Sequence, residues 1–133
     1  MFTARTKWTK EFQFEASATS GHVFAMDGDA KVASTPMELV LAALCGCTAY
    51  DVVSILQKKR EPFTGLEVSA KAEKAAQPPR VYTGIELLYR VAGNVSRKAV
   101  EDAVRLSEEK YCSVAAMLNK TAKITYRIEL DAK

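Results

Sequence analysis

The strongest constraint on the fold of this chain is one very apolar segment in its first half. From Leu39 to Tyr50 twelve consecutive residues carry no charge, and Asp51 ends the run. A helix that crosses a bilayer needs about 20 apolar residues, so we expect no membrane span here. The run is instead typical of a core helix in a soluble protein.

The residues before this run have the spacing of a helix N-terminus. Thr35 can cap the helix, Pro36 occupies the first helical position, and Glu38 can close a capping box. The predicted helix extends to about Lys59. It is apolar almost all round, so we expect it to be wrapped by a sheet and other helices, including those of a second subunit.

The segments on either side of the helix alternate with period two or show helical spacing. With 133 residues, the chain is predicted to be a single domain, residues 1–133, of the α+β class, with antiparallel strands and no regular βαβ repeat. The expected strands cover 2–18, 23–26, 66–72, 81–91 and 122–130, and further helices are expected from Ser96 to about Tyr111 and from Val114 to Leu118.

Composition excludes several classes of protein. Hydrophobic residues make up 48% and charged residues 26%, which is typical of a globular protein and not of a disordered one. The net charge of +3 is small and scattered, so we expect no nucleic-acid partner and no binding to an anionic membrane. The N-terminal residues lack the apolar core of a signal peptide, and a cytoplasmic location is expected.

Three cysteines are the residues with the most reactive side chains. Cys45 and Cys47 lie two residues apart on the predicted helix, about 200° around it, and His22 is the one histidine, so we expect no metal site. No phosphate-binding glycine loop is present, and no cofactor is expected. Cys112 opens a short helix beside Lys110, and both features would lower its pKa. From the residues alone, Cys47, in the middle of the apolar helix, is predicted to be a small buried hydrophobe.

Two motifs add a family resemblance. The segment 34–49 reads STPMELVLAALCGCTA and is followed by DVVSILQKKR at 51–60, while YCSV occupies 111–114. Both motifs and the order of elements resemble the OsmC/Ohr family, and most closely a branch whose function is less defined than that of the family's peroxidases. The resemblance covers essentially the whole chain.

The resemblance implies an intertwined homodimer in which two buried central helices pack between two sheets. It also implies a thiol peroxidase in which Cys47 attacks an organic hydroperoxide and becomes a sulfenic acid. Cys112 then condenses with Cys47 to a disulfide, which an external dithiol reduces. Cys45 faces elsewhere and has the character of a core residue.

The sequence departs from the family pattern at the groups that activate the thiolate. The peroxidases use an arginine from the N-terminal strand region, where this chain offers His22. Their glutamate lies ten residues before the cysteine, whereas Glu38 lies nine before Cys47 and can be occupied in the capping box. Asp51, four residues after Cys47, would share its helix face. Without a partner its carboxylate would raise the pKa of the Cys47 thiol, whereas an Arg or Lys held by Asp51 could replace the missing activating pair. The alternative is a non-catalytic dimer that binds a hydrophobic ligand or senses oxidants.

Overall fold

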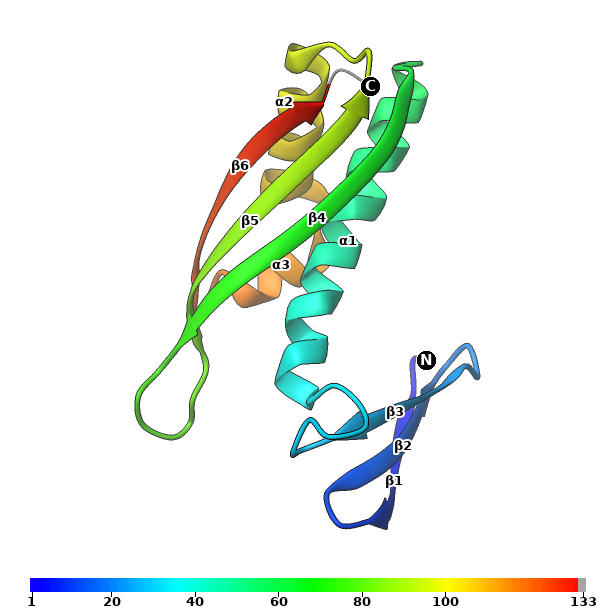
Figure 1. Cartoon of the computed structure of the whole chain (residues 1–133), viewed down its shortest axis with the longest axis vertical. Coiled ribbons are helices and arrows are strands. Elements are labelled where there is room, and N and C mark those ends of the chain that lie inside the picture. Colours follow the sequence, from blue (N-terminus) through cyan, green and yellow to red (C-terminus); the bar gives the residue numbers. More distant parts are fainter. Residues whose placement is uncertain (132–133) are drawn as a thin grey trace. The chain divides into compact units, whose positions relative to one another are not determined.

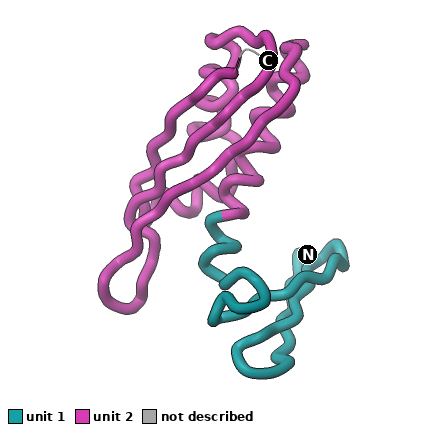
Figure 2. Tube along the Cα trace, in the orientation of Figure 1, with its two compact units in different colours: residues 1–41 teal, residues 42–133 magenta. Residues whose placement is uncertain are grey.

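The computed structural model describes residues 1–131 and divides the chain into two compact units, residues 1–41 and residues 42–133 (Figure 2). The first unit holds three short strands, and the second holds three long strands with the helices. The single domain over residues 1–133 stays a prediction, and within it the structure describes two compact units. Each is described by itself below.

The first unit is an antiparallel meander of β1 (Ala4–Lys10), β2 (Gln13–Ala18) and β3 (Val23–Asp27). The period-two pattern of the sequence places Trp8, Phe14 and Met26 opposite one another across the three strands. Few of these side chains are covered within the unit, and Trp8 keeps 64% of its surface exposed. Exposed apolar surface of this kind is typical of a face that contacts another protein surface.

The loop after β3 is organised by one buried carboxylate. Asp27 accepts hydrogen bonds from the backbone N–H groups of Asp29, Lys31 and Val32, at 2.8, 3.2 and 3.1 Å. The bond from Asp29 is the largest cause of the lowered pKa of this carboxyl group. The turn expected at this point in the sequence is therefore a closed loop that leads into the central helix.

The central helix α1 (Pro36–Lys58) begins as predicted. The Thr35 Oγ1 atom accepts from the N–H of Glu38 at 3.1 Å, and the Glu38 carboxylate accepts from the N–H of Thr35 at 2.8 Å. The prediction of burial all round is met on one stripe only, in residues spaced four apart. These buried residues of α1 are Leu44, Thr48, Val52 and Leu56.

The second unit packs its helices on one three-stranded sheet. β4 (Phe63–Lys74) pairs antiparallel with β5 (Tyr82–Gly93), and β6 (Lys123–Asp131) pairs parallel with β5. The expected antiparallel pattern thus fails for β6. Between β5 and β6 the chain crosses over through α2 (Arg97–Leu106), η1 (Ser107–Tyr111) and α3 (Ser113–Leu118). This crossover returns the chain to the end of the sheet where β5 begins, so β6 runs parallel to β5.

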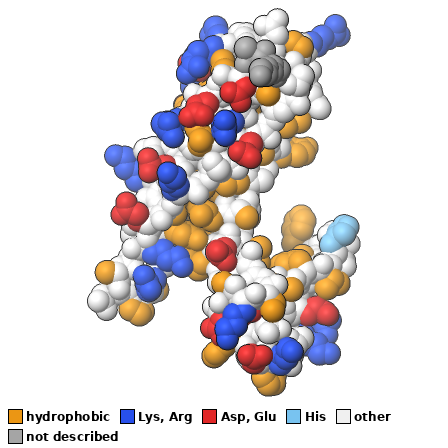
Figure 3. All heavy atoms as spheres, in the orientation of Figure 1, with side chains coloured by type: hydrophobic (Ala, Val, Ile, Leu, Met, Phe, Trp, Pro, Cys, Tyr) orange, Lys and Arg blue, Asp and Glu red, His pale blue; other side chains and the backbone are white. Residues whose placement is uncertain are grey.

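The core of this unit forms where alternate residues of β5 meet the helices. Leu87, Tyr89 and Val91 are at most 1% exposed, as are Val100 and Val104 of α2. Figure 1 shows the helices of this unit on one side of the sheet. In Figure 3 the opposite face carries Lys, Arg, Asp and Glu side chains of both signs interspersed.

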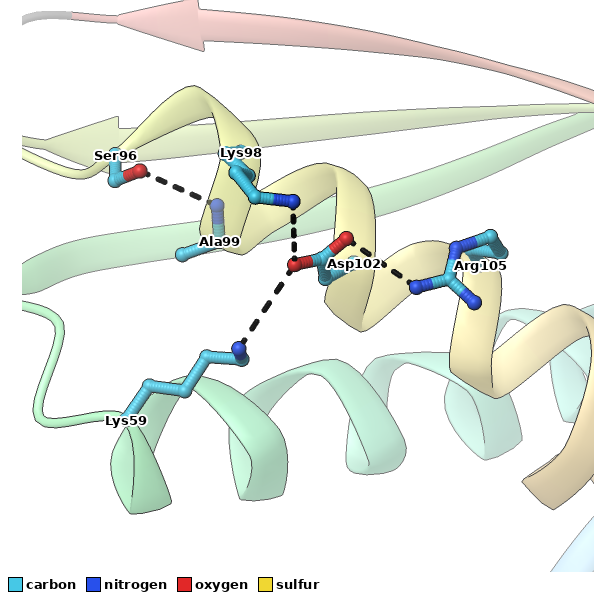
Figure 4. Close-up of polar contacts among 6 residues, drawn as sticks. All are labelled: Lys59, Ser96, Lys98, Ala99, Asp102 and Arg105. Atoms are coloured by element: carbon cyan, nitrogen blue, oxygen red, sulfur yellow. Dashed lines mark hydrogen bonds and ion pairs between the residues drawn. The ribbon is translucent and has the colours of Figure 1, made fainter.

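A group of charges ties the end of α1 to α2 (Figure 4). Asp102 lies 3.3 Å from Arg105, 3.5 Å from Lys98 and 4.0 Å from Lys59, and Ser96 caps α2 through the N–H of Ala99. The hydrogen bond from Arg105 is the largest cause of the lowered pKa of Asp102. Lys59, which directly follows α1, thus has an acidic partner on α2.

Candidate thiol site

The structure brings together the two cysteines that the sequence analysis paired. Cys47 lies in the middle of α1 and is half-buried, whereas Cys112 is the N-cap of α3 and is 3% exposed. Their side chains are within hydrogen-bonding reach of each other. Sixty-five positions apart in sequence, the two sulfurs therefore share one place in the second unit.

The predicted low pKa of Cys112 is wrong. The pKa of this thiol is raised to about 12, mainly because the side chain is buried, with further contributions from the hydrogen bond to Cys47 and the charge of Glu108. The N–H of Ala115 donates to the Cys112 Sγ at 3.4 Å and acts in the opposite direction. Burial outweighs the helix N-terminus, and the ammonium of Lys110 lies over the ring of Tyr111, 5.3 Å from its centroid.

These environments make the two thiols chemically different. Cys112 keeps its proton and can donate a hydrogen bond to the sulfur of Cys47. Cys47 is the more accessible of the pair and is the thiol that a molecule from solvent can reach. Cys45 is also half-buried, and burial raises the pKa of its thiol.

Beside the thiol pair lies a chain of polar side chains that the sequence analysis missed. The buried Thr48 Oγ1 is 2.6 Å from the Tyr89 hydroxyl and 2.7 Å from the Ser107 Oγ. Tyr89 donates to the Glu108 carboxylate at 2.6 Å, and Ser107 donates to the Asp51 carboxylate at 2.9 Å. Three hydroxyls thus connect two carboxyl groups across α1, β5 and η1.

The backbone between α2 and α3 places two members of this chain. Residues Ser107–Tyr111 form a π-helical turn, closed by the N–H of Cys112 donating to the Ser107 carbonyl at 2.8 Å. Such turns shift the residues that follow around the helix axis and are frequent at functional sites. The sequence does contain a signal for two of these residues, because a polar side chain stands on an otherwise apolar helix face. Thr48 lies on the buried stripe of α1, and Ser107 continues the apolar face of α2.

The candidate activating residues have other partners in the structure. Glu38 is engaged in the capping box, and Asp51 accepts from Ser107 and not from a cation. His22 is exposed in the first unit, where its Nδ1 lies 2.9 Å from the Ser20 Oγ. Within residues 1–131 neither Asp51 nor Glu108 forms an ion pair with Lys or Arg, so the described chain supplies no arginine–carboxylate pair for the thiols.

A groove of about 480 Å³ opens next to the Asp51 end of the polar chain. Four of its eight lining side chains are apolar or aromatic, and the other four are one acid, one serine and two lysines near the end of α1. The lining residues are Tyr50, Asp51, Ser54, Ile55, Lys58, Lys59, Leu106 and Tyr111. Over the described residues, no three His, Cys, Asp or Glu side chains are grouped so that they could hold a metal ion. The chemistry available at this place is therefore that of thiols, hydroxyls and carboxyl groups.

Fold and thiol pair together define a protein with two cysteines brought together on an α+β scaffold. The OsmC-like protein family model matches residues 27–127, and the chain belongs to this family. It is 46% identical to Protein YhfA of Escherichia coli K12 over 131 residues, covering 97% of this chain and 98% of YhfA.

Solved structures agree with this assignment. A hypothetical protein from Aquifex aeolicus superimposes with a TM-score of 0.86 at 31% identity, with 98% of both chains covered. An organic hydroperoxide resistance protein OsmC from Legionella pneumophila has the same fold, with a TM-score of 0.72 at 13% identity over 97% of this chain and 96% of its own. The 23-residue helix α1 is long and apolar enough to cross a membrane by composition alone, but in this family it is the core helix of a soluble protein.

Proposed function

We propose that this protein is a thiol-dependent peroxidase that reduces organic hydroperoxides, with Cys47 as the attacking thiol and Cys112 as the resolving thiol. The observation that carries the proposal is the contact between an accessible and a buried cysteine at one site. The family includes a protein described as an organic hydroperoxide resistance protein, which supports the same chemistry.

The reaction balances in three steps. The Cys47 thiolate attacks the outer oxygen of ROOH, the O–O bond breaks, and the alkoxide takes up a proton to leave as ROH. The sulfenic acid on Cys47 then condenses with the Cys112 thiol to a disulfide and water. An external dithiol reduces the disulfide and restores both thiols.

The apolar part of the groove beside Asp51 favours an organic over an inorganic peroxide. Tyr50, Ile55 and Leu106 offer contact to an alkyl or aryl group, which hydrogen peroxide lacks. A dithiol-reducible cycle of this kind needs a reducing compartment, and we propose the cytoplasm.

We also propose that the working form is an intertwined homodimer. α1 leaves Ala42, Gly46 and Tyr50 exposed on its second face, and Trp8 and Phe24 are 64% and 46% exposed on the first sheet. Apolar surface of this extent is covered in soluble proteins, and a second copy supplies the partner helix that the sequence pattern requires. Sedimentation of the purified protein tests this: a monomer at micromolar concentration contradicts it.

A second candidate, binding of a hydrophobic ligand without turnover, is favoured by one observation. The carboxyl groups of Asp51 and Glu108 lie near the thiols with no Lys or Arg paired to them in residues 1–131, and an unpaired carboxylate opposes a thiolate. The two candidates differ in whether peroxide is consumed.

The deciding experiment follows loss of cumene hydroperoxide in the presence of a dithiol. We expect turnover by the native protein, loss of turnover in Cys47→Ser, and a single turnover followed by accumulation of sulfenic acid in Cys112→Ser. Cys45→Ser, which removes a half-buried thiol of the same helix, is the matched control and should keep full activity. Unchanged turnover in Cys47→Ser contradicts the proposal, and binding of cumene alcohol without turnover by the native protein supports the second candidate.

A further inference from the structure

The polar chain beside the thiols has too few protons for its own hydrogen bonds. Its oxygen atoms lie in the order Asp51, Ser107, Thr48, Tyr89, Glu108, with successive separations of 2.9, 2.7, 2.6 and 2.6 Å. All four separations are typical of O–H···O hydrogen bonds, and each such bond needs one proton between its oxygens.

Three hydroxyl groups supply three protons. If both carboxyl groups are ionised, Ser107 must donate to Asp51 and Tyr89 must donate to Glu108. Thr48 then has one proton for two hydroxyl neighbours, at 2.6 and 2.7 Å, and for the Glu108 carboxylate, at 3.4 Å. At least one of the two short contacts therefore brings two oxygens together with no proton between them. A contact that short without a hydrogen is repulsive, and Thr48 is fully buried, so solvent cannot supply the missing donor.

A fourth proton on either carboxyl group removes the conflict. With the proton on Glu108, every hydroxyl donates toward Asp51, and with the proton on Asp51, every hydroxyl donates toward Glu108. Both arrangements satisfy all four contacts. Rotation of the three hydroxyls converts one into the other, so the two carboxyl groups share a single proton along the chain.

Asp51 and Glu108, the two ends of the polar chain, lie close to the two thiols in sequence and in space. Asp51 follows Cys47 by four residues on α1, and Glu108 precedes Cys112 by four and acts electrostatically on its thiol. With one shared proton this neighbourhood carries one negative charge instead of two. A thiolate beside it is therefore less strongly opposed.

We propose that Asp51 and Glu108 share one proton through Ser107, Thr48 and Tyr89, and that this chain delivers a proton to the alkoxide released when Cys47 opens the peroxide. The second half of this inference rests on the proposed function. The Cys47 thiol releases its own proton to solvent on becoming a thiolate. When the O–O bond breaks, RO⁻ takes the shared proton and leaves as ROH, and a proton from solvent then restores the polar chain.

Infrared spectroscopy tests the shared proton without reference to activity. A protonated carboxyl group gives a C=O stretching band that is separate from the amide and carboxylate bands and shifts in D₂O. At neutral pH we expect this band in the native protein and its loss in Asp51→Asn and in Glu108→Gln, because the amide N–H of either variant supplies the fourth donor. Glu109→Gln, which changes an exposed neighbour, is the matched control and should keep the band.

The sharpest variant leaves both carboxyl groups in place. Thr48→Val removes the middle hydroxyl with little change in shape, so each carboxylate retains its own hydroxyl donor and no fourth proton is needed. We expect the band to vanish in Thr48→Val and to persist in Thr48→Ser. A native protein with no band, or a band that Thr48→Val leaves unchanged, overturns the proposal.

Peroxide turnover of the same variants separates this inference from the proposed function. If the native protein shows the band, the turnover rates of the two Thr48 variants are compared. A lower rate in Thr48→Val than in Thr48→Ser, with Cys47 alkylated equally fast in both, supports delivery of the proton. Equal rates overturn that role. A native protein that shows the band and consumes no peroxide contradicts the proposed function and leaves the proton assignment standing.

Discussion

The hydrogen bond between Tyr89 and Glu108 should be measurable as a coupling in protein stability. Tyr89 is fully buried, and its hydroxyl lies 2.6 Å from both the Glu108 carboxylate and the Thr48 hydroxyl. Tyr89→Phe removes the hydroxyl and leaves two partners without it. Hydrogen bonds to charged groups contribute about 1.5–3 kcal/mol, and an orphaned buried partner costs a similar amount, so we expect a loss of about 2 kcal/mol.

Removing both partners should cost less than the two single losses added together. Glu108→Ala leaves the Tyr89 hydroxyl with Thr48 alone, whereas Tyr89→Phe with Glu108→Ala leaves an apolar pair and no orphan. We expect a coupling free energy of about 1.5 kcal/mol in the double-mutant cycle.

The assay is chemical unfolding of the four proteins at one fixed protein concentration, because the stability of the proposed dimer would depend on concentration. For a chain of this length a loss of 2 kcal/mol corresponds to a fall in Tm of about 7 °C. Glu109→Ala is the control, and its effect should stay within about 0.5 kcal/mol because the side chain is exposed. If the Tyr89 and Glu108 effects add within about 0.5 kcal/mol, the short contact contributes nothing specific and the account of the polar chain is refuted.

Three further expected results concern the Cys112 thiol and the start of α1. In a variant with Cys45→Ser and Cys47→Ser, the raised pKa of Cys112 should leave it unalkylated in the native protein near pH 8 and rapidly alkylated in denaturant; equal rates contradict its burial. Because the folded thiol keeps its proton to a higher pH than the unfolded value of 9.0, this group favours the folded state below pH 9.0, and unfolding experiments should show that contribution lost as the pH rises toward about 12. Thr35→Ala should cost about 1 kcal/mol in the same unfolding assay by removing the capping oxygen from the Glu38 N–H, and no loss would mean that the capping box is dispensable.

The parts of this fold that could be predicted from sequence are those set by local patterns. The capping residues Thr35 and Glu38 fixed the start of α1, and alternation fixed the strands. The pairing of β6 with β5 could not be read in this way, because parallel pairing depends on where the crossover of residues 97–118 returns the chain. Alternation is the same in parallel and antiparallel strands.

The thiol site was predictable in its members and not in its electrostatics. The family motif identified Cys47 and Cys112, and the structure places them in contact. The helix N-terminus at Cys112 suggested a low pKa, but the extent of burial is a property of the packed unit and cannot be counted along the chain. Burial reverses the sign of the effect.

The π-helical turn explains why the polar chain escaped a reading based on helical periodicity. A regular helix advances about 100° per residue, and one π-helical turn adds an extra residue to the count. Positions counted from α2 through Ser107–Tyr111 are therefore displaced relative to Cys112. Ser107, at the start of the turn, bonds to Asp51 and Thr48, and the next residue, Glu108, bonds to Tyr89, so adjacent residues serve opposite ends of the polar chain.

The same turn links the stability of the fold to its chemistry. No buried side-chain oxygen or nitrogen among the described residues lacks a hydrogen-bond partner, so the polar chain is held inside an apolar core with every group bonded. The N–H of Cys112 closes the π-helical turn on the carbonyl of Ser107, whose hydroxyl belongs to the chain. The π-helical turn therefore joins the backbone of Cys112 directly to a residue of the polar chain.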